Sequence, residues 1–151
     1  MSVQNTAKKN HPYNYKSNRR TSKNYSIMKF YWKMPQGLQP HYQRELEDYQ
    51  SAFLVGNLSR AWQHLERAHI LGQPWAVEHS EVHWLMLRFG FAIKSGKEVR
   101  GQILRLVFGG VKSFVGKVPT GNTGGADVPP LLPMDIPEDL QEMLRPYSPS
   151  L

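Results

Sequence analysis

Apolar residues recur at helical spacing over four long stretches of the chain. The first two stretches, residues 40–55 and 58–72, are separated by Gly56-Asn57, residue types that tolerate the left-handed conformation at the end of a helix. The second stretch has its apolar positions on one stripe at the i, i+3, i+4, i+7 spacing, and Gly72-Gln73-Pro74 ends it. Two helices joined by so short a connection pack antiparallel, so these residues predict a helical hairpin.

The next two stretches predict a second hairpin. Residues 76–94 are apolar almost all round, which is typical of a central and largely buried helix. Ser95-Gly96 separates them from a fourth helix over residues 97–114. We expect one core to be shared by the two hairpins and to contain Trp62, Leu65, Trp84, Leu87, Phe91 and Ile103.

The remainder of the chain predicts a loop and one short helix. Residues 116–130 are too rich in Gly and Pro for regular structure. Pro137 then opens a short helix with acidic residues in its first turn, and Pro146 stops it. No segment alternates with period two over the length of a strand. The predicted fold class is all-α: a compact bundle of two antiparallel hairpins, a Gly/Pro-rich loop and a C-terminal helix.

Small and large apolar residues follow a distinctive spacing along the first hairpin, at Gly56, Ala61, Leu65 and Ala68. This spacing is similar to that of a tetratricopeptide repeat and predicts the same close packing of two helices. Residues 96–105 repeat it only loosely. Fewer than three units form no extended solenoid, so we expect a compact pair of hairpins.

The net positive charge comes from the N-terminal part of the chain. The 151 residues carry a formal net charge of +7, but nine Lys or Arg precede the first carboxylate, Glu45. From Glu45 onward, 10 basic and 12 acidic residues give a net charge of −2. Residues 1–27 are polar and show no periodicity, which predicts a disordered basic tail before a single helical domain, residues 28–151. Because the charge is not patterned on a folded surface, we expect no specific recognition of nucleic acid.

Composition excludes several classes of site. The chain has no cysteine, so disulfides, thiolate zinc sites, iron–sulfur clusters and cysteine nucleophiles are excluded. No apolar run approaches the roughly 20 residues that cross a bilayer. The N-terminus also lacks the apolar stretch of a secretory signal. We therefore expect a cytoplasmic protein without a membrane span.

Four separated segments carry a family resemblance. They are WQHLERAHILGQ at residues 62–73, His79-x3-His83-Trp-Leu-Met-Leu at 79–87, Glu98-x-x-Gly-Gln at 98–102, and PTGNTGG at 119–125. In this order they resemble an uncharacterised bacterial family, the domain of unknown function 3703, over about residues 41–144. The resemblance implies a small, soluble, single-domain helical protein. It assigns no catalytic residue, because no activity is established for the family.

The histidines form the strongest candidate site. His79 and His83 are one helical turn apart, and Met86 follows three residues later, so the three share one face. His69 lies in the apolar stripe of the preceding helix, close to the connecting turn. Imidazoles in this arrangement predict a metal site for zinc or, beside a thioether, copper. Possible additional ligands are Glu66, His64, Glu78, Glu81 and Met86.

A structural role is the alternative for each of these residues. A pair of histidines at i, i+4 arises often by chance, and Met86 fits core packing equally well. His69 would then donate a hydrogen bond to a buried carbonyl, or to Glu78 or Glu81. If metal does bind, affinity should fall below about pH 6.5, because coordination needs neutral imidazoles.

The Gly-rich loop is a weaker candidate. Successive backbone N–H groups there could form an anion-binding nest from Lys117, Gly121, Asn122, Thr123, Gly124 and Gly125. The loop does not have the Gly-Lys-Ser/Thr ending of a P-loop and follows a helix. We favour the interpretation that its glycines adopt positive φ while the loop packs over the bundle.

Three functions follow from these candidates. The first is a small helical protein that binds or handles a transition metal through its histidine-rich face. The second is a helical-hairpin interaction module that binds a protein partner or a second copy of itself, without catalysis. The third is a small enzyme that uses His69, His79 and His83 as acid and base, with the Asn122 loop over the site.

Overall fold

The computed structural model describes residues 31–115 and 120–147, and within residues 108–115 it describes the backbone only. The described residues form five α-helices: α1 (Gln39–Leu54), α2 (Leu58–Gly72), α3 (Ala76–Ala92), α4 (Gly96–Val115) and α5 (Glu138–Leu144). They contain no β-strand beyond one isolated bridge, between Tyr31 and Trp75. The all-α fold class is confirmed. The predicted tail, residues 1–27, and Lys117 lie outside the described residues.

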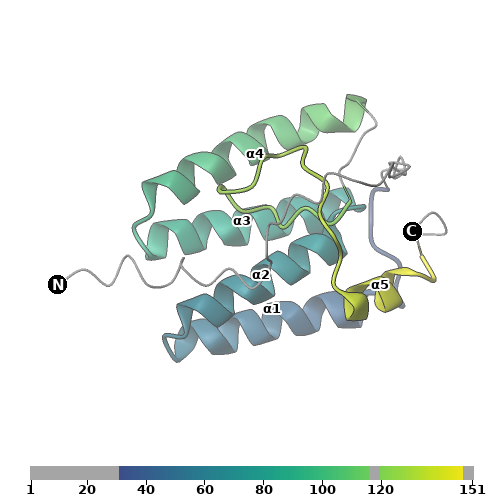
Figure 1. Ribbon diagram of the computed structural model, residues 1–151, viewed down its shortest axis with the longest axis horizontal. Coiled ribbons are helices and arrows are strands. Elements are labelled where there is room, and N and C mark those ends of the chain that lie inside the picture. Colours follow the sequence, from purple (N-terminus) through teal and green to yellow (C-terminus); the bar gives the residue numbers. More distant parts are fainter. Residues whose placement is uncertain (1–30, 116–119, 148–151) are drawn as a thin grey trace.

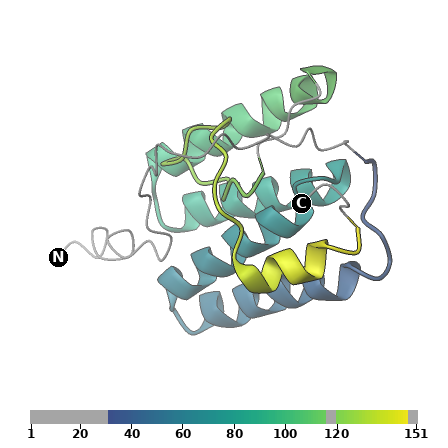
Figure 2. The same cartoon turned by 45° about the vertical axis from the view of Figure 1, so that its right-hand side comes forward.

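The four long helices lie side by side in chain order, as Figure 1 and Figure 2 show. α1 and α2 form one antiparallel hairpin, α3 and α4 form the second, and α2 packs against α3 where the two hairpins meet. The segment after α4 crosses the second hairpin before α5 packs against α2. Tetratricopeptide-like packing of the two hairpins stays a prediction.

The turn between α1 and α2 is built by the residues that the sequence analysis selected. Gly56 has a φ of 74°, a backbone conformation that residues with a Cβ rarely adopt. The Asn57 side chain then accepts a hydrogen bond from the backbone N–H of Arg60 at 3.2 Å and caps α2. Because Gly56 ends α1 and Asn57 caps α2 directly after it, the chain reverses direction and α2 returns along α1.

The start of α3 is held by the chain just before α1. The backbone N–H groups of Ala76 and Val77 donate to the carbonyls of Tyr31 and Trp32, at 2.9 and 3.2 Å. These are donors that the first turn of a helix leaves without an intrahelical partner. Nearby, a carboxylate oxygen of Glu78 accepts from the backbone N–H of Met34 at 3.2 Å. These bonds fix the first turn of α3, which immediately precedes the two histidines of that helix.

The hydrophobic core lies between α1, α2, α3 and α5. It does not extend to the outer side of the second hairpin. Leu65 and Leu87 are buried as predicted, and Trp62 is half-buried against the core. Trp84, Phe91 and Ile103 were predicted to be core residues, but their exposed fractions are 54%, 61% and 43%. This part of the prediction is wrong: α2 and the segment after α4 cover one face of the hairpin, and these three side chains lie away from it.

Leu65→Ala is expected to lower the free energy of unfolding by about 2 to 5 kcal/mol. Leu65 is fully buried in the core, so truncation removes apolar contacts and leaves a cavity that neighbouring helices fill only in part. Denaturant unfolding followed by circular dichroism measures the loss. Leu54→Ala is the matched control, since Leu54 is 84% exposed; equal effects of the two substitutions would contradict the assigned core.

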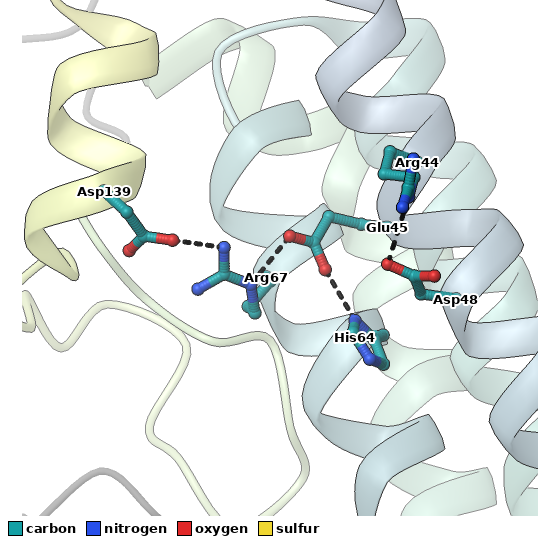
Figure 3. A network of polar contacts seen from close by, with 6 residues as sticks. All are labelled: Arg44, Glu45, Asp48, His64, Arg67 and Asp139. Carbon is teal, nitrogen blue, oxygen red and sulfur yellow. Dashed lines mark hydrogen bonds and ion pairs between the residues drawn. The ribbon is translucent and has the colours of Figure 1, made fainter.

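A polar network ties the first hairpin to the C-terminal helix (Figure 3). Arg67 of α2 donates from Nε to Glu45 of α1 at 2.7 Å and from Nη2 to Asp139 of α5. The other carboxylate oxygen of Glu45 lies 2.7 Å from Nδ1 of His64. The hydrogen bond from Arg67 lowers the pKa of Asp139. The network therefore joins three helices, with His64 engaged in it.

None of the helices within residues 31–115 and 120–147 combines the length and apolarity needed to cross a bilayer.

Candidate metal centre

Three histidine side chains converge between α2 and α3. The Nε2 atom of His69 lies 3.0 Å from that of His79 and 3.2 Å from that of His83, and the latter two are 3.2 Å apart. His69 and His83 are buried, and His79 is half-buried. The turn over residues 72–75 places the end of α2 beside the first turns of α3. The structure therefore brings together the three residues that the sequence analysis selected as principal ligands.

The hydrogen bonds on the far side of two rings fix their tautomers. His69 donates from Nδ1 to the backbone carbonyl of Asn122 at 2.8 Å. His83 Nδ1 lies 2.7 Å from Oε1 of Gln102, whose Nε2 donates to Glu98 and to the Gly124 carbonyl. Because the Gln102 amide is oriented by those two acceptors, its oxygen must accept from His83. In the neutral rings of His69 and His83, Nε2 therefore has no proton and carries a lone pair.

The neutral form is favoured for the most buried ring. Burial, and next the neighbouring His83 and His79, lower the pKa of His69 well below its ordinary value. The Nε2 lone pairs of His69 and His83 then face each other at 3.2 Å. Two lone pairs at this distance repel unless a positive centre lies between them. A proton on Nε2 of His79 forms a hydrogen bond along one side of the triangle. A metal cation between the three Nε2 atoms would interact with all of them.

The triangle has nearly the dimensions of three of the four ligand positions of a tetrahedral zinc site. A tetrahedral ion at 2.0 to 2.1 Å from each imidazole nitrogen holds those nitrogens about 3.3 Å apart. The observed separations of 3.0 to 3.2 Å are slightly shorter. Three imidazoles leave the fourth tetrahedral position to water or another ligand. The arrangement is chemically able to hold a borderline transition metal ion through nitrogen ligands.

The loop after α4 covers the histidine cluster. Its Asn122 is buried, and the Asn122 side chain donates to the carbonyls of Pro129 and Leu132 while accepting from the N–H of Gly124. Gly124 has a φ of 81°, and a Cβ there would lie 2.6 Å from the His69 ring. The loop is thus closed by Asn122 and packs directly on His69, which fits the interpretation favoured from the sequence.

Three polar residues of α4 hold that loop in place. Glu98, Gln102 and Arg105 are spaced at i, i+4 and i+7 and share one face of the helix. Glu98 accepts from the N–H of Ala126 at 3.1 Å, and Arg105 donates to the carbonyls of Gly125 and Val128. Since Gln102 also orients His83, one helix face positions both the loop and a ring of the cluster. Such outer contacts are typical of metal-ligating histidines.

Glu98, Gln102 and Arg105 were not predicted from the sequence as site residues. Their i, i+4, i+7 spacing along one face of the predicted helix was the available signal, because polar residues on a buried face need partners. Those partners lie 20 to 28 residues further along the chain, in the loop. The carbonyl that accepts from His69 is 53 residues away.

The additional ligands proposed from the sequence lie in other contacts. His64 pairs with Glu45, Glu78 accepts from Met34, and Glu81 accepts from the Tyr42 hydroxyl at 3.0 Å. Met86 is buried in the hydrophobic core. Within the described parts of the chain, the group of potential ligand atoms lying within 4.8 Å of one another is that of His69, His79 and His83.

The proposed anion nest is also engaged in the fold. Residues 121–125 are all buried, and the carbonyls of Asn122, Gly124 and Gly125 accept from His69, Gln102 and Arg105. Anion binding by this loop stays a prediction, with Lys117 outside the described residues. The observed contacts give the loop a positioning role.

Comparison with known proteins identifies the family. A family model described as "Protein of unknown function (DUF3703)" matches residues 36–144. The chain belongs to this family. The matched range of the DUF3703 domain contains the three histidines, α4 and the covering loop. Searches of curated proteins and of solved structures returned no significant match.

A buried carboxyl group lies under the covering loop of this DUF3703 domain. Glu66 of α2 is fully buried, next to the side chains of Trp62 and Thr123. Burial raises the pKa of Glu66 to about 8, and the negative charges of Glu98 and Asp127 add to the rise. Glu66 therefore keeps its proton at neutral pH.

Glu66→Gln is expected to change how stability depends on pH. A folded-state pKa of about 8, against 4.5 for an unperturbed carboxyl, makes the contribution of Glu66 greatest below pH 4.5 and removes it as pH rises to 8. The glutamine amide does not titrate. The free energy of unfolding of the variant should therefore rise by about 4 kcal/mol relative to that of the wild type between these two pH values. Denaturant unfolding across this range measures the difference, and a constant difference would contradict the buried, protonated state.

Proposed function

We propose that this protein binds a transition metal ion, zinc or copper, through His69, His79 and His83, and acts in metal binding or metal handling. The observation that carries the proposal is the triangle of three Nε2 atoms within 3.2 Å of one another. Two of these atoms, in His69 and His83, carry a lone pair because Nδ1 of each ring holds the proton and donates it to a hydrogen bond. A metal cation relieves their repulsion and completes the interaction of all three rings.

The donor set supports a borderline ion. Three imidazole nitrogens suit zinc, copper and nickel, whereas calcium and magnesium prefer oxygen ligands. The rings of His69 and His83 are held by a backbone carbonyl and a neutral amide, so they enter coordination as neutral ligands. Zinc is the first ion to test because a three-histidine set is well known for it. Copper is the second, because imidazole nitrogens also suit it.

Calorimetric titration of the full chain without a histidine tag tests the proposal. With zinc chloride or copper(II) sulfate, we expect one ion to bind per chain and thermal unfolding to shift upward as ion concentration exceeds the dissociation constant. Absence of saturable binding by either ion would contradict the proposal. Binding by more than one ion with equal affinity would indicate surface sites instead, and would also count against it.

A further inference from the structure

The second hairpin exposes large apolar side chains on both of its helices. The exposed fractions are 42% for Val77, 54% for Trp84 and 61% for Phe91 on α3, and 43% for Ile103 and 63% for Val107 on α4. We call these five side chains the α3–α4 face. Together they leave roughly 600 Å² of apolar surface in contact with solvent, at the upper end of what the largest patch on a monomeric protein shows.

The five residues lie on one side of the hairpin. His83 of α3 contacts Gln102 of α4, so these two positions mark the line along which the helices meet. Trp84 and Ile103 each follow by one residue, a rotation of about 100°. Because the helices run antiparallel, these rotations turn both side chains toward the same side. The covering loop is bonded to Glu98, Gln102 and Arg105, which lie on the other side.

The amount of exposed surface fits a protein interface. A stable complex buries about 800 Å² on each partner. The roughly 600 Å² exposed by the α3–α4 face is the larger part of this area. A pair of antiparallel helices with one apolar side exposed becomes a four-helix bundle when two copies pack face to face, an arrangement in which neighbouring helices remain antiparallel.

Charge favours a second copy as the occupant. Glu81 and Arg88 are both exposed and lie three residues before and four residues after Trp84 along one edge of the stripe on α3. A two-fold axis near Trp84 places Glu81 of each copy opposite Arg88 of the other. Residues 1–30 contain seven Lys or Arg and no Asp or Glu, so they offer no acidic partner to Arg88.

We propose that the α3–α4 face is the interface of a homodimer, in which the α3–α4 hairpins of two copies form a four-helix bundle about a two-fold axis near Trp84. The dimer does not depend on the metal site, because His83 lies along the line where α3 and α4 meet and the loop covers the histidines from the side opposite to the α3–α4 face. Failure of metal binding therefore leaves this proposal intact, and failure of dimerisation leaves the metal proposal intact.

Sedimentation equilibrium of the full chain, at micromolar concentrations and with a chelator present, tests the dimer. We expect a dimer for the wild type and a dissociation constant raised by roughly 100-fold or more for Trp84→Glu, since a central aromatic anchor is replaced by a charge. Leu54→Glu is the matched control: Leu54 is 84% exposed at the end of α1, outside the interface. Circular dichroism establishes that each variant keeps its helices.

A charge exchange tests the orientation of the two copies. Arg88→Glu should weaken the dimer, because each new carboxylate faces Glu81 of the other copy, and adding Glu81→Arg should restore it. A monomeric wild type would overturn the proposal and assign the α3–α4 face to residues 1–30 or to a different partner. A dimer that Trp84→Glu leaves unchanged, or that the charge exchange does not restore, would also overturn it.

Discussion

Gly124→Ala is expected to destabilise the protein by about 2 to 5 kcal/mol and to abolish metal binding. Two costs combine at this position. Gly124 has a φ of 81°, a conformation that costs a residue with a Cβ about 1 to 2 kcal/mol. The new Cβ would also lie 2.6 Å from the His69 ring, and overpacking of this kind costs a further 1 to 3 kcal/mol. Relief of the clash requires His69 or the loop to move.

Gly56→Ala separates the two costs. Gly56 has a φ of 74°, close to that of Gly124, but an added Cβ would have nothing within 4 Å. This control should therefore show the backbone cost alone, about 1 to 2 kcal/mol, with metal affinity unchanged. Denaturant unfolding and zinc titration of both variants provide the comparison. Equal effects on both quantities would show that the loop does not press on His69 as described.

His83→Ala is expected to weaken zinc binding by at least about 100-fold. The substitution removes one of three nitrogen ligands and leaves two. Two ligands are no more than a pair of histidines one turn apart on any exposed helix provides. It also leaves Gln102 without the ring that it orients. Calorimetric titration of the variant with zinc measures the loss directly, independently of any change in folding stability.

His41→Ala is the matched control for that measurement. His41 is exposed on α1 and takes no part in the cluster. We expect its zinc affinity to equal that of the wild type. If His83→Ala lowers only the unfolding temperature of the metal-free protein and leaves zinc affinity unchanged, the three histidines are structural.

Local chemistry accounts for what the sequence predicted correctly. Gly56-Asn57 and Gly72-Gln73-Pro74 mark helix ends through backbone conformation, which depends on few neighbours. The i, i+4 spacing of His79 and His83 fixes their common face, and the short turn after α2 brings His69 to it. The three histidines could therefore be selected before any tertiary structure was known.

Long-range packing accounts for what the sequence analysis missed. α3 is apolar almost all round, so its pattern does not distinguish the side that α2 and the loop cover from the side that bears Trp84. The path of the loop decides this, and it is fixed by contacts between α4 and residues more than 20 positions away. For the same reason Gln102 and the Asn122 carbonyl, which orient two rings, were not identified as part of the centre.

X-ray absorption spectroscopy of the untagged full chain, loaded with zinc and freed of excess ion, tests the central claim most directly. We expect one ion per chain, with three imidazole nitrogens at about 2.0 to 2.1 Å and a further light-atom ligand in the fourth position. The same measurement on His83→Ala should lose one imidazole. A wild-type protein that retains no ion, or an ion surrounded by fewer than three imidazoles, would contradict the account.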